Sequence, residues 1–287
     1  MPEVFIAGAV RTPLGKFLGG LSSFSAPQLG AMVVRESLKR SGVPADRVDE
    51  VIMGNVISAG LGQNPARQAS IYGGVTETAG ALTVNKVCGS GLKAVILGTQ
   101  AIKLGDADIV VAGGMENMSA APYILRQART GYRLNDGAIV DTMVFDGLWD
   151  IYNNFHMGNT AELVSEKYKV SRAEMDEYAY NSHRKAVEAH EKGRFKDEML
   201  TVEIPQKKGD PVRIDRDEGP RPDSTVEGMR KLKPVFKADG TITAANSSQI
   251  SDGAAAMVLL SEAKAKELKV KPIARVTGYA TGGMKPE

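Results

Sequence analysis

Short apolar runs alternate with helical patterns through about the first 114 residues of this 287-residue chain. The segments VFIAGAV, VDEVIMGNVI, ALTVNKV and ADIVVAGG have the length and apolar character of strands, and amphipathic stretches lie between them. Strands that alternate with helices in this way usually join into a buried, largely parallel sheet. The sequence therefore predicts an α/β fold, with a mostly parallel mixed sheet and helices on both of its faces.

Capping signals support several of the helices. Ser25 can cap the segment that follows it, and Gly42 can end the same helix as a C′ glycine does. The sequence SRAE, residues 171–174, matches a capping box and predicts a helix that runs to Gly193. The polar, proline-containing segment QKKGDPVRIDRDEGPRPDS predicts a loop.

The middle of the chain breaks the alternation, which suggests an insertion. Turns, aromatic residues and scattered arginines with little periodicity begin near residue 118, and a strand and a helix return after residue 246. We therefore expect residues 1–117 and 247–270 to form one α/β domain, with residues 118–246 as an inserted loop domain. Residues 271–287 begin another strand, as the start of a further domain would.

Composition narrows the possible partners and the compartment. The formal net charge is +2, so nothing favours a nucleic acid or an anionic membrane as a partner. No segment approaches the roughly 20 apolar residues of a membrane span, and the N-terminal apolar run is interrupted by Arg11. A single cysteine, Cys88, makes no internal disulfide and no cysteine-based metal site. We expect a cytoplasmic protein with no metal centre.

Cys88 occupies an informative position, between a predicted strand and a predicted helix. Amide groups in the first turn of a helix are free, and the helix dipole favours a thiolate there. A thiolate can attack an acyl carbon and form a thioester. Gly89 and Gly91 leave the approach to the sulfur open and let backbone N–H groups reach an oxyanion. The pattern therefore makes Cys88 a candidate nucleophile.

Two other interpretations fit the same residues. A lone cysteine is commonly a small buried apolar residue, with no chemical role. The segment GSGLKA, residues 89–94, also fits the G-x-G-x-x-A pattern of a dinucleotide-binding turn. That pattern calls for an acidic residue roughly 20 positions further on, and Glu116 lies beyond that distance. Dinucleotide binding is the remoter alternative.

The segment NKVCGSGLKAV closely resembles the nucleophile segment of thiolases, the acyl-CoA C-acetyltransferases. Further resemblances keep the family's order from Met1 to about Pro272: AVRTPLGKFLGGLSS, GNVISAGLGQNPARQAS, VVAGGMENMSAAPY, DGLWDIYNNFHMGNTAE and TITAANSSQISDGAAAMVLL. The resemblance implies a thiolase-like layered fold. DGLWD and FHMG are more similar to the biosynthetic acetoacetyl-CoA thiolases than to the long-chain degradative ones.

The resemblance also implies a reaction, the condensation of two acetyl-CoA to acetoacetyl-CoA and free CoA, or the reverse thiolysis. Cys88 matches the residue that carries the acetyl group, and coenzyme A enters as part of the substrate, with no covalently bound cofactor. Residues that match contacts to CoA are His156, Met157, Arg221, Leu232, Phe236, Ala244 and Ser248. Gly228 replaces a serine of some relatives. In some relatives a tyrosine like Tyr152 and the carbonyls of a loop like 244–247 bind potassium.

Without the resemblance these residues have ordinary structural explanations. His156 would be a core histidine with satisfied hydrogen bonds, and Arg221 a solvated loop arginine between two prolines. Ser248 would be a turn residue. A guanidinium nevertheless suits the phosphates of CoA, either by paired hydrogen bonds or by stacking on the adenine.

Two blocks of the family's mechanism are not found in these 287 residues. One is a GHPxG block, whose histidine activates the nucleophile, and the other is a CxGGG block, whose cysteine moves a proton on the second acetyl group. Both belong to the family's C-terminal domain. We expect a truncated chain that does not condense acetyl-CoA alone, and the alternatives are a non-catalytic CoA-binding protein and a split thiolase that needs a partner chain. The segment ILRQARTGYR resembles an assembly loop, which implies a homo-oligomer, a dimer or a tetramer.

Overall fold

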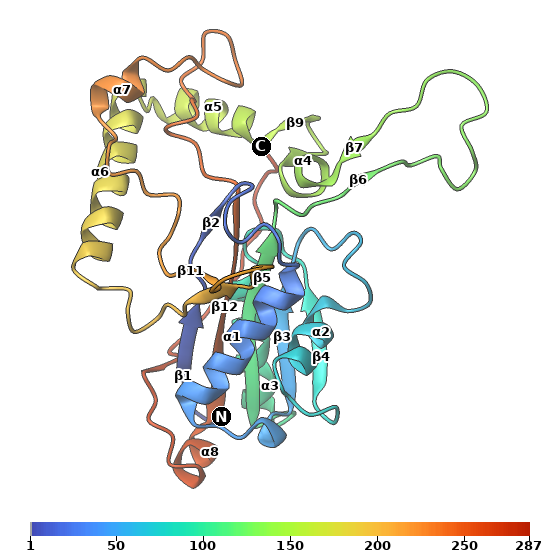
Figure 1. Ribbon diagram of the computed structural model, residues 1–287, viewed down its shortest axis with the longest axis vertical. Helices are drawn as coiled ribbons and strands as arrows, with labels where there is room; N and C mark the ends of the chain where they lie inside the picture. The colour runs from blue at the N-terminus through green and yellow to red at the C-terminus, as the bar shows by residue number, and fades with distance from the viewer. Residues whose placement is uncertain (1) are drawn as a thin grey trace. The chain divides into compact units, whose positions relative to one another are not determined.

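The computed structural model describes residues 2–287 and contains two compact units (Figure 1). The first unit comprises residues 2–122, 196–218 and 251–281, and the second comprises residues 123–195, 219–250 and 282–287. Residues 196–218 thus group with the first unit, although they fall inside the expected insertion. The expected domain boundaries stay a prediction.

A seven-stranded sheet forms the centre of the first unit. Its strands are β1 (Val4–Arg11), β2 (Gly15–Lys16), β3 (Glu50–Gly54), β4 (Gly80–Val84), β5 (Ile109–Asn117), β12 (Ser251–Ser261) and β13 (Ala274–Arg275). The order across the sheet is β13-β1-β12-β5-β3-β4, and β2 pairs with one end of β12. The four strands predicted from the first 114 residues are therefore confirmed as β1, β3, β4 and β5.

The sheet is mixed, because one long strand runs against the others. β3 is parallel to both β4 and β5, whereas β12 is antiparallel to both β5 and β1. It follows that β1, β3, β4 and β5 all point the same way. The predicted mostly parallel mixed sheet is confirmed, and β12 lies between β1 and β5 although it is the last long strand of the chain.

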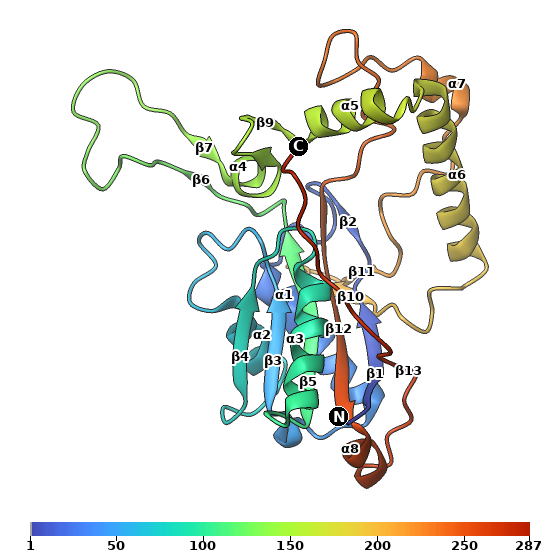
Figure 2. The ribbon, with the colours of Figure 1, turned by 180° about the vertical axis from the view of Figure 1, so that it is seen from behind.

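Helices cover both faces of this sheet, as predicted. Helices α1 (Ala26–Ser41) and α2 (Pro65–Tyr72) pack on one face, and α3 (Ser90–Leu104) packs on the other (Figure 2). Fully buried aliphatic side chains from the strands alternate between the two faces, so Val51 and Met53 meet the α1 side while Ile52 meets α3. The short helices η1 (Ala45–Arg47) and α8 (Glu262–Glu267) complete the helices of this unit.

Local capping explains where the main helices begin and end. Ser25 accepts a hydrogen bond from the Gln28 N–H, and the Gln28 side chain accepts one from the Ser25 N–H. Gly42 then ends α1 in the left-handed conformation, with a φ of 72°. The predicted capping box at residues 171–174 is also present, and it starts α6 (Arg172–Glu191).

The second unit consists of short elements and longer connections. Its strands are β6 (Tyr123–Ile124), β7 (Val140–Asp141), β8 (Trp149–Asp150) and β9 (Phe155–His156). Besides α6, its helices are α4 (Thr142–Gly147), α5 (Met157–Tyr168) and α7 (Val226–Arg230). Its strands form two separate hairpins, β6–β7 and β8–β9.

The segment predicted as a polar loop contains a strand. β11 (Val212–Ile214) lies inside it and pairs with β10 (Val202–Ile204) as an antiparallel hairpin in the first unit. The prediction of an unbroken loop was wrong because the short run VRI is surrounded by charged and proline residues that hide it. No helix within residues 2–287 is both long and apolar enough to span a membrane.

Candidate active site

Cys88 lies in the turn between β4 and α3, where the sequence placed it. β4 ends at Val84 and α3 begins at Ser90, with Gly89 as its N-cap residue. The side chain of Cys88 is exposed. This exposure contradicts the interpretation of Cys88 as a buried apolar residue.

The residue before the cysteine has an unusual backbone conformation. Val87 has a φ of 48°, in the left-handed region. A β-branched residue is rarely found there, and a non-glycine residue in this region costs about 1–3 kcal/mol. Strain of this kind persists only where neighbouring groups hold the chain. The turn at Cys88 is therefore a constrained structure.

Two side chains hold the strained turn by hydrogen bonds. The Ser90 hydroxyl accepts from the Lys86 N–H at 2.8 Å and donates to the Val87 carbonyl at 2.6 Å. The Asn85 carboxamide oxygen accepts from the Val87 N–H at 2.9 Å. Ser90 is only 4% exposed, so its hydroxyl acts from inside the protein. Both peptide groups of Val87 are thus fixed by side chains.

Gly54, at the end of β3, allows the start of α3 to lie directly on the sheet. A Cβ atom added to Gly54 would lie 2.6 Å from both the Gly91 nitrogen and the Ser90 carbonyl carbon. A Cβ on Gly91 would come no closer than 3.6 Å to its neighbours, and one on Gly89 no closer than 3.4 Å. Internal packing therefore requires a glycine at position 54, whereas Gly89 and Gly91 only leave space around the turn.

Glu116, considered above as a ligand for a dinucleotide, already accepts hydrogen bonds from residues of this chain. Its carboxylate accepts hydrogen bonds from the Asn55 side chain at 2.9 Å and from the N–H groups of Val56 and Ile57 at 2.8 and 3.2 Å. Burial raises the pKa of Glu116, and these hydrogen bonds oppose that rise. A carboxylate that holds the loop after β3 in this way is not free for a ribose, which argues against dinucleotide binding.

In the second unit, His156 and Phe236 come together. Their rings stack with centroids 4.9 Å apart and an angle of 20° between the planes. The ring of Phe236 also covers Gly158, where an added Cβ would overlap its atoms. Met157 directly follows His156 in the sequence as the first residue of α5, and its side chain is 42% exposed. These contacts unite two of the residues that the resemblance assigned to CoA, although they come from segments 80 residues apart in the numbering.

The hydrogen bonding of His156 determines which ring nitrogen carries the proton. The Gly158 N–H donates to Nδ1 of His156 at 2.9 Å, so Nδ1 is unprotonated and a neutral ring carries its proton on Nε2. Burial lowers the pKa of His156, which favours that neutral form. In this state His156 can donate a hydrogen bond from Nε2 and cannot accept a proton there.

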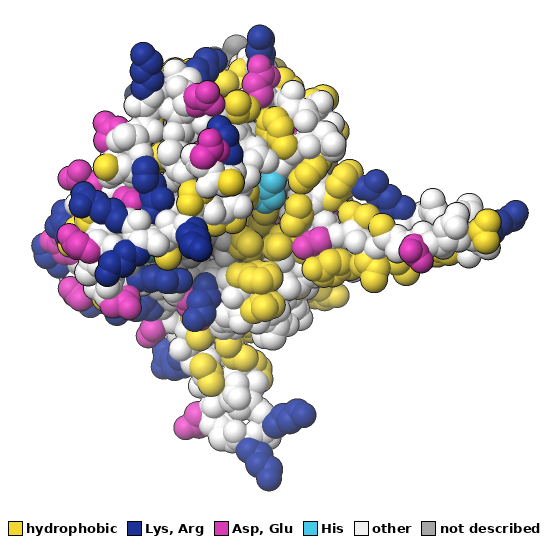
Figure 3. Space-filling view, turned by 90° about the horizontal axis from the view of Figure 1, so that it is seen from above, with side chains coloured by type: hydrophobic (Ala, Val, Ile, Leu, Met, Phe, Trp, Pro, Cys, Tyr) yellow, Lys and Arg dark blue, Asp and Glu magenta, His cyan; other side chains and the backbone are white. Residues whose placement is uncertain are grey.

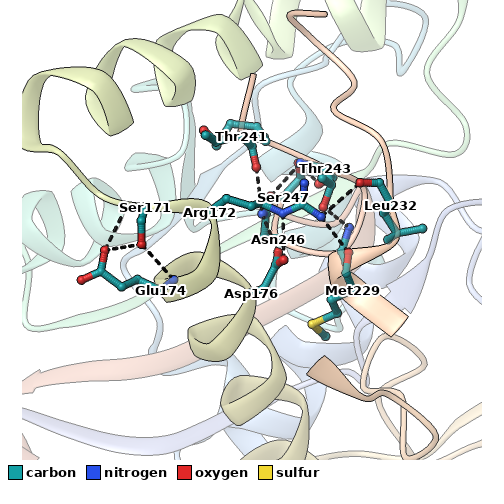
Figure 4. Close-up of polar contacts among 12 residues, drawn as sticks. Ser171, Arg172, Glu174, Asp176, Met229, Leu232, Thr241, Thr243, Asn246 and Ser247 are labelled. Carbon is teal, nitrogen blue, oxygen red and sulfur yellow. Dashed lines mark hydrogen bonds and ion pairs between the residues drawn. The ribbon is translucent and has the colours of Figure 1, made fainter. Parts of the chain in front are cut away.

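A buried polar network supports the segments that carry Leu232 and Ala244 (Figure 4). Asp176, which is fully buried, pairs with Nε of Arg172 at 2.8 Å and accepts from the Asn246 side chain at 3.0 Å. Nη2 of Arg172 donates to the carbonyls of Met229 and Leu232 at 2.7 and 3.1 Å. The N-terminal end of α6, residues 172–176, therefore fixes both segments.

A second carboxylate anchors the same loop from α5. Glu162 accepts hydrogen bonds from the N–H groups of Thr241 and Ile242 and from the Thr241 hydroxyl, at 2.8–3.0 Å. Burial raises the pKa of Glu162, but these donors together with Lys237 outweigh burial, so the pKa lies below its ordinary value. Ala244 and Ser248 are exposed on the loop that this network holds.

Arg221 lies at a different place in the second unit. Its backbone N–H donates to Nδ1 of His183 at 3.1 Å, and it borders a cavity of about 290 Å³ against α6. Burial lowers the pKa of His183, and the charge of Arg221 lowers it further. The cavity is lined by Tyr180, His183, Arg184, Val187, Glu188, Glu191, Arg221, Pro222 and Ser224. Of the predicted CoA contacts, Arg221 thus borders this cavity, His156 and Phe236 form the stack, and Leu232 and Ala244 lie on the segments that the buried network holds.

The residues that hold these two regions are not among those predicted from the sequence. Ser90 is one serine among many, and nothing in the sequence marks Val87 as left-handed. The i, i+4 spacing of Arg172 and Asp176 is a usable signal for a helical ion pair, but the same spacing is common on exposed helices. Only the fold shows that Asp176 is buried.

Comparison with known proteins identifies the family. The N-terminal domain of thiolase matches residues 4–263. An acetyl-CoA acetyltransferase of Pseudomonas aeruginosa is 52% identical over 286 residues, which are 100% of this chain and 73% of that protein. An acetyl-CoA acetyltransferase of Cupriavidus necator is 53% identical over 287 residues, which are 100% of this chain and 73% of that protein. A probable acetyl-CoA acetyltransferase of Escherichia coli is 50% identical over 286 residues, which are 100% of this chain and 72% of that protein. The chain belongs to the thiolase family of acyltransferase enzymes.

Proposed function

We propose that this chain takes the acetyl group of acetyl-CoA onto Cys88, as the acyl-transfer step of a biosynthetic acetoacetyl-CoA thiolase. The thiolate sulfur attacks the carbonyl carbon of acetyl-CoA, a new carbon–sulfur bond forms, and the bond to the sulfur of CoA breaks. CoA leaves as a thiolate and takes up a proton. The observation that carries the proposal is the exposed thiol in a strained turn at the start of α3.

The start of α3 favours this step electrostatically. The partial positive charge at a helix N-terminus stabilises both the attacking thiolate and the oxyanion of the tetrahedral intermediate. Gly89, the N-cap residue, has no side chain to block the approach of a thioester. In the second step a carbanion from another acetyl-CoA attacks the thioester, which gives acetoacetyl-CoA and frees the Cys88 thiolate.

We assign binding of CoA to the second unit. The stacked rings of His156 and Phe236, with Met157, offer an apolar surface to the pantetheine arm, and Nε2–H of His156 offers one hydrogen bond. Leu232, Ala244 and Ser248 are exposed on the segments that the Arg172–Asp176 network holds. Arg221 supplies a guanidinium for a phosphate.

The carbanion step needs a proton acceptor, and His156 does not provide one. Its Nδ1 is already used by the Gly158 N–H, and burial lowers its pKa. We therefore propose that the 287 residues perform acetyl transfer and do not condense acetyl-CoA by themselves. Robust formation of acetoacetyl-CoA by the isolated chain would contradict this part of the proposal.

Mass spectrometry of the intact protein tests acetyl transfer directly. After incubation with acetyl-CoA we expect the mass of one acetyl group to be added to the chain, and Cys88→Ser to abolish this stable adduct. Because Cys88 is the only cysteine, an adduct that persists in Cys88→Ser would refute the assignment. Binding of CoA at saturation with no adduct would instead support the alternative, a non-catalytic CoA-binding or partner-dependent protein.

We also propose a cytoplasmic homo-oligomer, a dimer or a tetramer. The segment 123–141, which carries β6 and β7 and extends to the right in Figure 3, exposes hydrophobic side chains. They are Tyr123, Leu125, Tyr132, Leu134 and Ile139. Hydrophobic side chains exposed together mark protein interaction sites. Sedimentation equilibrium tests this, and Leu134→Glu is expected to lower the assembled fraction if the segment joins copies.

A further inference from the structure

We propose that Ser90 is a positioning residue for the nucleophile, which acts by holding Val87 in its left-handed conformation and so sets the direction of the Cys88 thiol. The inference deepens the proposed function and rests on it, since it concerns how Cys88 meets an acyl donor. Ser90 itself is buried and touches no ligand in this scheme.

The geometry of the turn makes Ser90 the connection between the sheet and the cysteine. Its Cβ lies where a side chain of Gly54 would be, since a Cβ added there would be 2.7 Å away. Its hydroxyl reaches back along the chain, accepting from the N–H of Lys86 and donating to the carbonyl of Val87. The sheet therefore determines where Ser90 lies, and Ser90 determines the backbone that leads into Cys88.

A second set of contacts supports the same residue from the outside. Asn85 accepts from the Val87 N–H, and its amide group donates to the Val56 carbonyl at 3.4 Å. Val56 in turn donates its N–H to the partly buried carboxylate of Glu116. Val87 is thus held on its N–H side by Asn85 and on its carbonyl side by Ser90, and a conformation that valine disfavours is kept.

Loss of the hydrogen bonds made by Ser90 should change the direction of the Cys88 thiol more than its exposure to solvent. Cys88 is exposed, so a small freely diffusing reagent can approach its sulfur from many directions. A thioester held by bound CoA must meet the sulfur along one direction, and reactions of this kind are sensitive to small displacements. Ser90→Ala is therefore expected to slow acetyl transfer at saturating acetyl-CoA by about tenfold, with unchanged CoA affinity. Alkylation of Cys88 by iodoacetamide should change little.

The single cysteine allows a direct measurement of the turn that needs no acyl donor. Bromotrifluoroacetone, which loses bromide to the Cys88 sulfur, places one trifluoromethyl group there for fluorine NMR. The wild type should give one narrow line, and Ser90→Ala should give a broadened or split line, because the turn then populates several conformations. The matched control is Ser70→Ala, which removes a fully buried hydroxyl of the same unit that has no hydrogen-bond partner among the described residues. Its spectrum and its acetyl transfer should equal those of the wild type.

Asn85→Ala covers the case in which Ser90→Ala does not fold. Asn85 is exposed, so its replacement leaves the core intact, and it should broaden the same fluorine line. The proposal is overturned if the line in Ser90→Ala, or in Asn85→Ala where the first variant does not fold, is as narrow as in the wild type. The proposal is also overturned if the rate of alkylation and the rate of acetyl transfer fall by the same factor in the variant. If the wild type takes no acetyl group, the proposed function fails, and the fluorine line still decides the role of Ser90.

Discussion

Different kinds of contact stabilise the interior of each of the two compact units. In the first unit, aliphatic side chains with no exposed surface pack between the sheet and the helices on both of its faces. In the second unit, the buried hydrophobic side chains among the described residues are only Val187, Met229 and Ile242. Its segments are joined instead by the carboxylates of Asp176 and Glu162.

The difference predicts different responses to mutation and to solvent. Burial of apolar surface depends little on pH, and its loss is graded with the volume removed. A buried ion pair behaves otherwise, because removal of one partner leaves a charge without compensation. Cys88, the proposed nucleophile, thus belongs to the unit held by apolar packing, and the proposed CoA contacts belong to the unit held by buried carboxylates.

The largest effect should come from Asp176→Ala. This change leaves Arg172 and Asn246 without their buried acceptor, and the breaking of a buried pair typically costs about 3–5 kcal/mol. Urea unfolding followed by emission of Trp149, the only tryptophan, reports on this unit. The control is Glu188→Ala on the same helix, whose partners Arg184 and Lys192 are exposed, so little change is expected. Equal losses in the two variants would contradict the polar account of this unit.

The next effect concerns packing in the first unit. Gly54→Ala places a methyl group against the backbone of Ser90 and Gly91, and overpacking of this kind costs about 1–3 kcal/mol. It should also broaden the fluorine line of labelled Cys88, since the turn rests on Gly54. Gly91→Ala is the control, because its nearest neighbour at 3.6 Å leaves room for a methyl group. Intolerance of alanine at position 91 and tolerance at 54 would reverse our account of the turn.

A smaller effect is expected at the aromatic stack. Gly158→Ala displaces the ring of Phe236 from His156, and an aromatic pair is worth about 1 kcal/mol, so CoA affinity should fall roughly fivefold. Calorimetry with CoA measures this. If Gly158 acts through the ring, Gly158→Ala should have no further effect in a Phe236→Ala background, and additive losses would refute that route.

The smallest effect is a difference in acid sensitivity. The lowered pKa of Glu162 means that its contribution to stability is present above the pKa of an unfolded glutamate, about 4.3, and is lost as the pH falls through the folded value. The raised pKa of Glu116 has the opposite sign, so its contribution is present at low pH and is lost as the pH rises through the folded value.

Acidification should therefore weaken the second unit first. We expect the urea midpoint reported by Trp149 to fall as the pH is lowered through about 4 and below. Glu162→Gln should flatten this dependence, because its amide does not titrate in that range. A variant that keeps the full acid sensitivity of the wild type would show that another group is responsible.

Much of the first unit could be predicted from the sequence, because its signals are local. Ser25 and Gly42 bound α1 through contacts within a few residues, and apolar runs identify β1, β3, β4 and β5, whereas the short β11 was missed. The place of Cys88 at the junction of β4 and α3 follows from the same signals. The antiparallel position of β12 between β1 and β5 could not be predicted, because pairing between strands far apart in the sequence gives no local signal in either segment.

The support of the candidate site could not be predicted for physical reasons. Valine disfavours a positive φ, so its own chemistry argues against the conformation that Val87 adopts. Asp176 becomes a buried anchor only when Asn246, 70 residues later in the chain, is placed beside it. His156 was singled out by resemblance alone, and its Nδ1 contact with Gly158 depends on where α5 begins.

The central place of β12 has a consequence for synthesis on the ribosome. β1 and β5 emerge early, yet the strand that joins them, residues 251–261, is made more than 130 residues after β5 ends at Asn117. Until then the nascent chain carries two apolar strands with unpaired backbone edges, which are prone to aggregate. Completion of the sheet has to wait until residues 251–261 have been made, so this enzyme should depend on chaperones that bind extended apolar segments during its production.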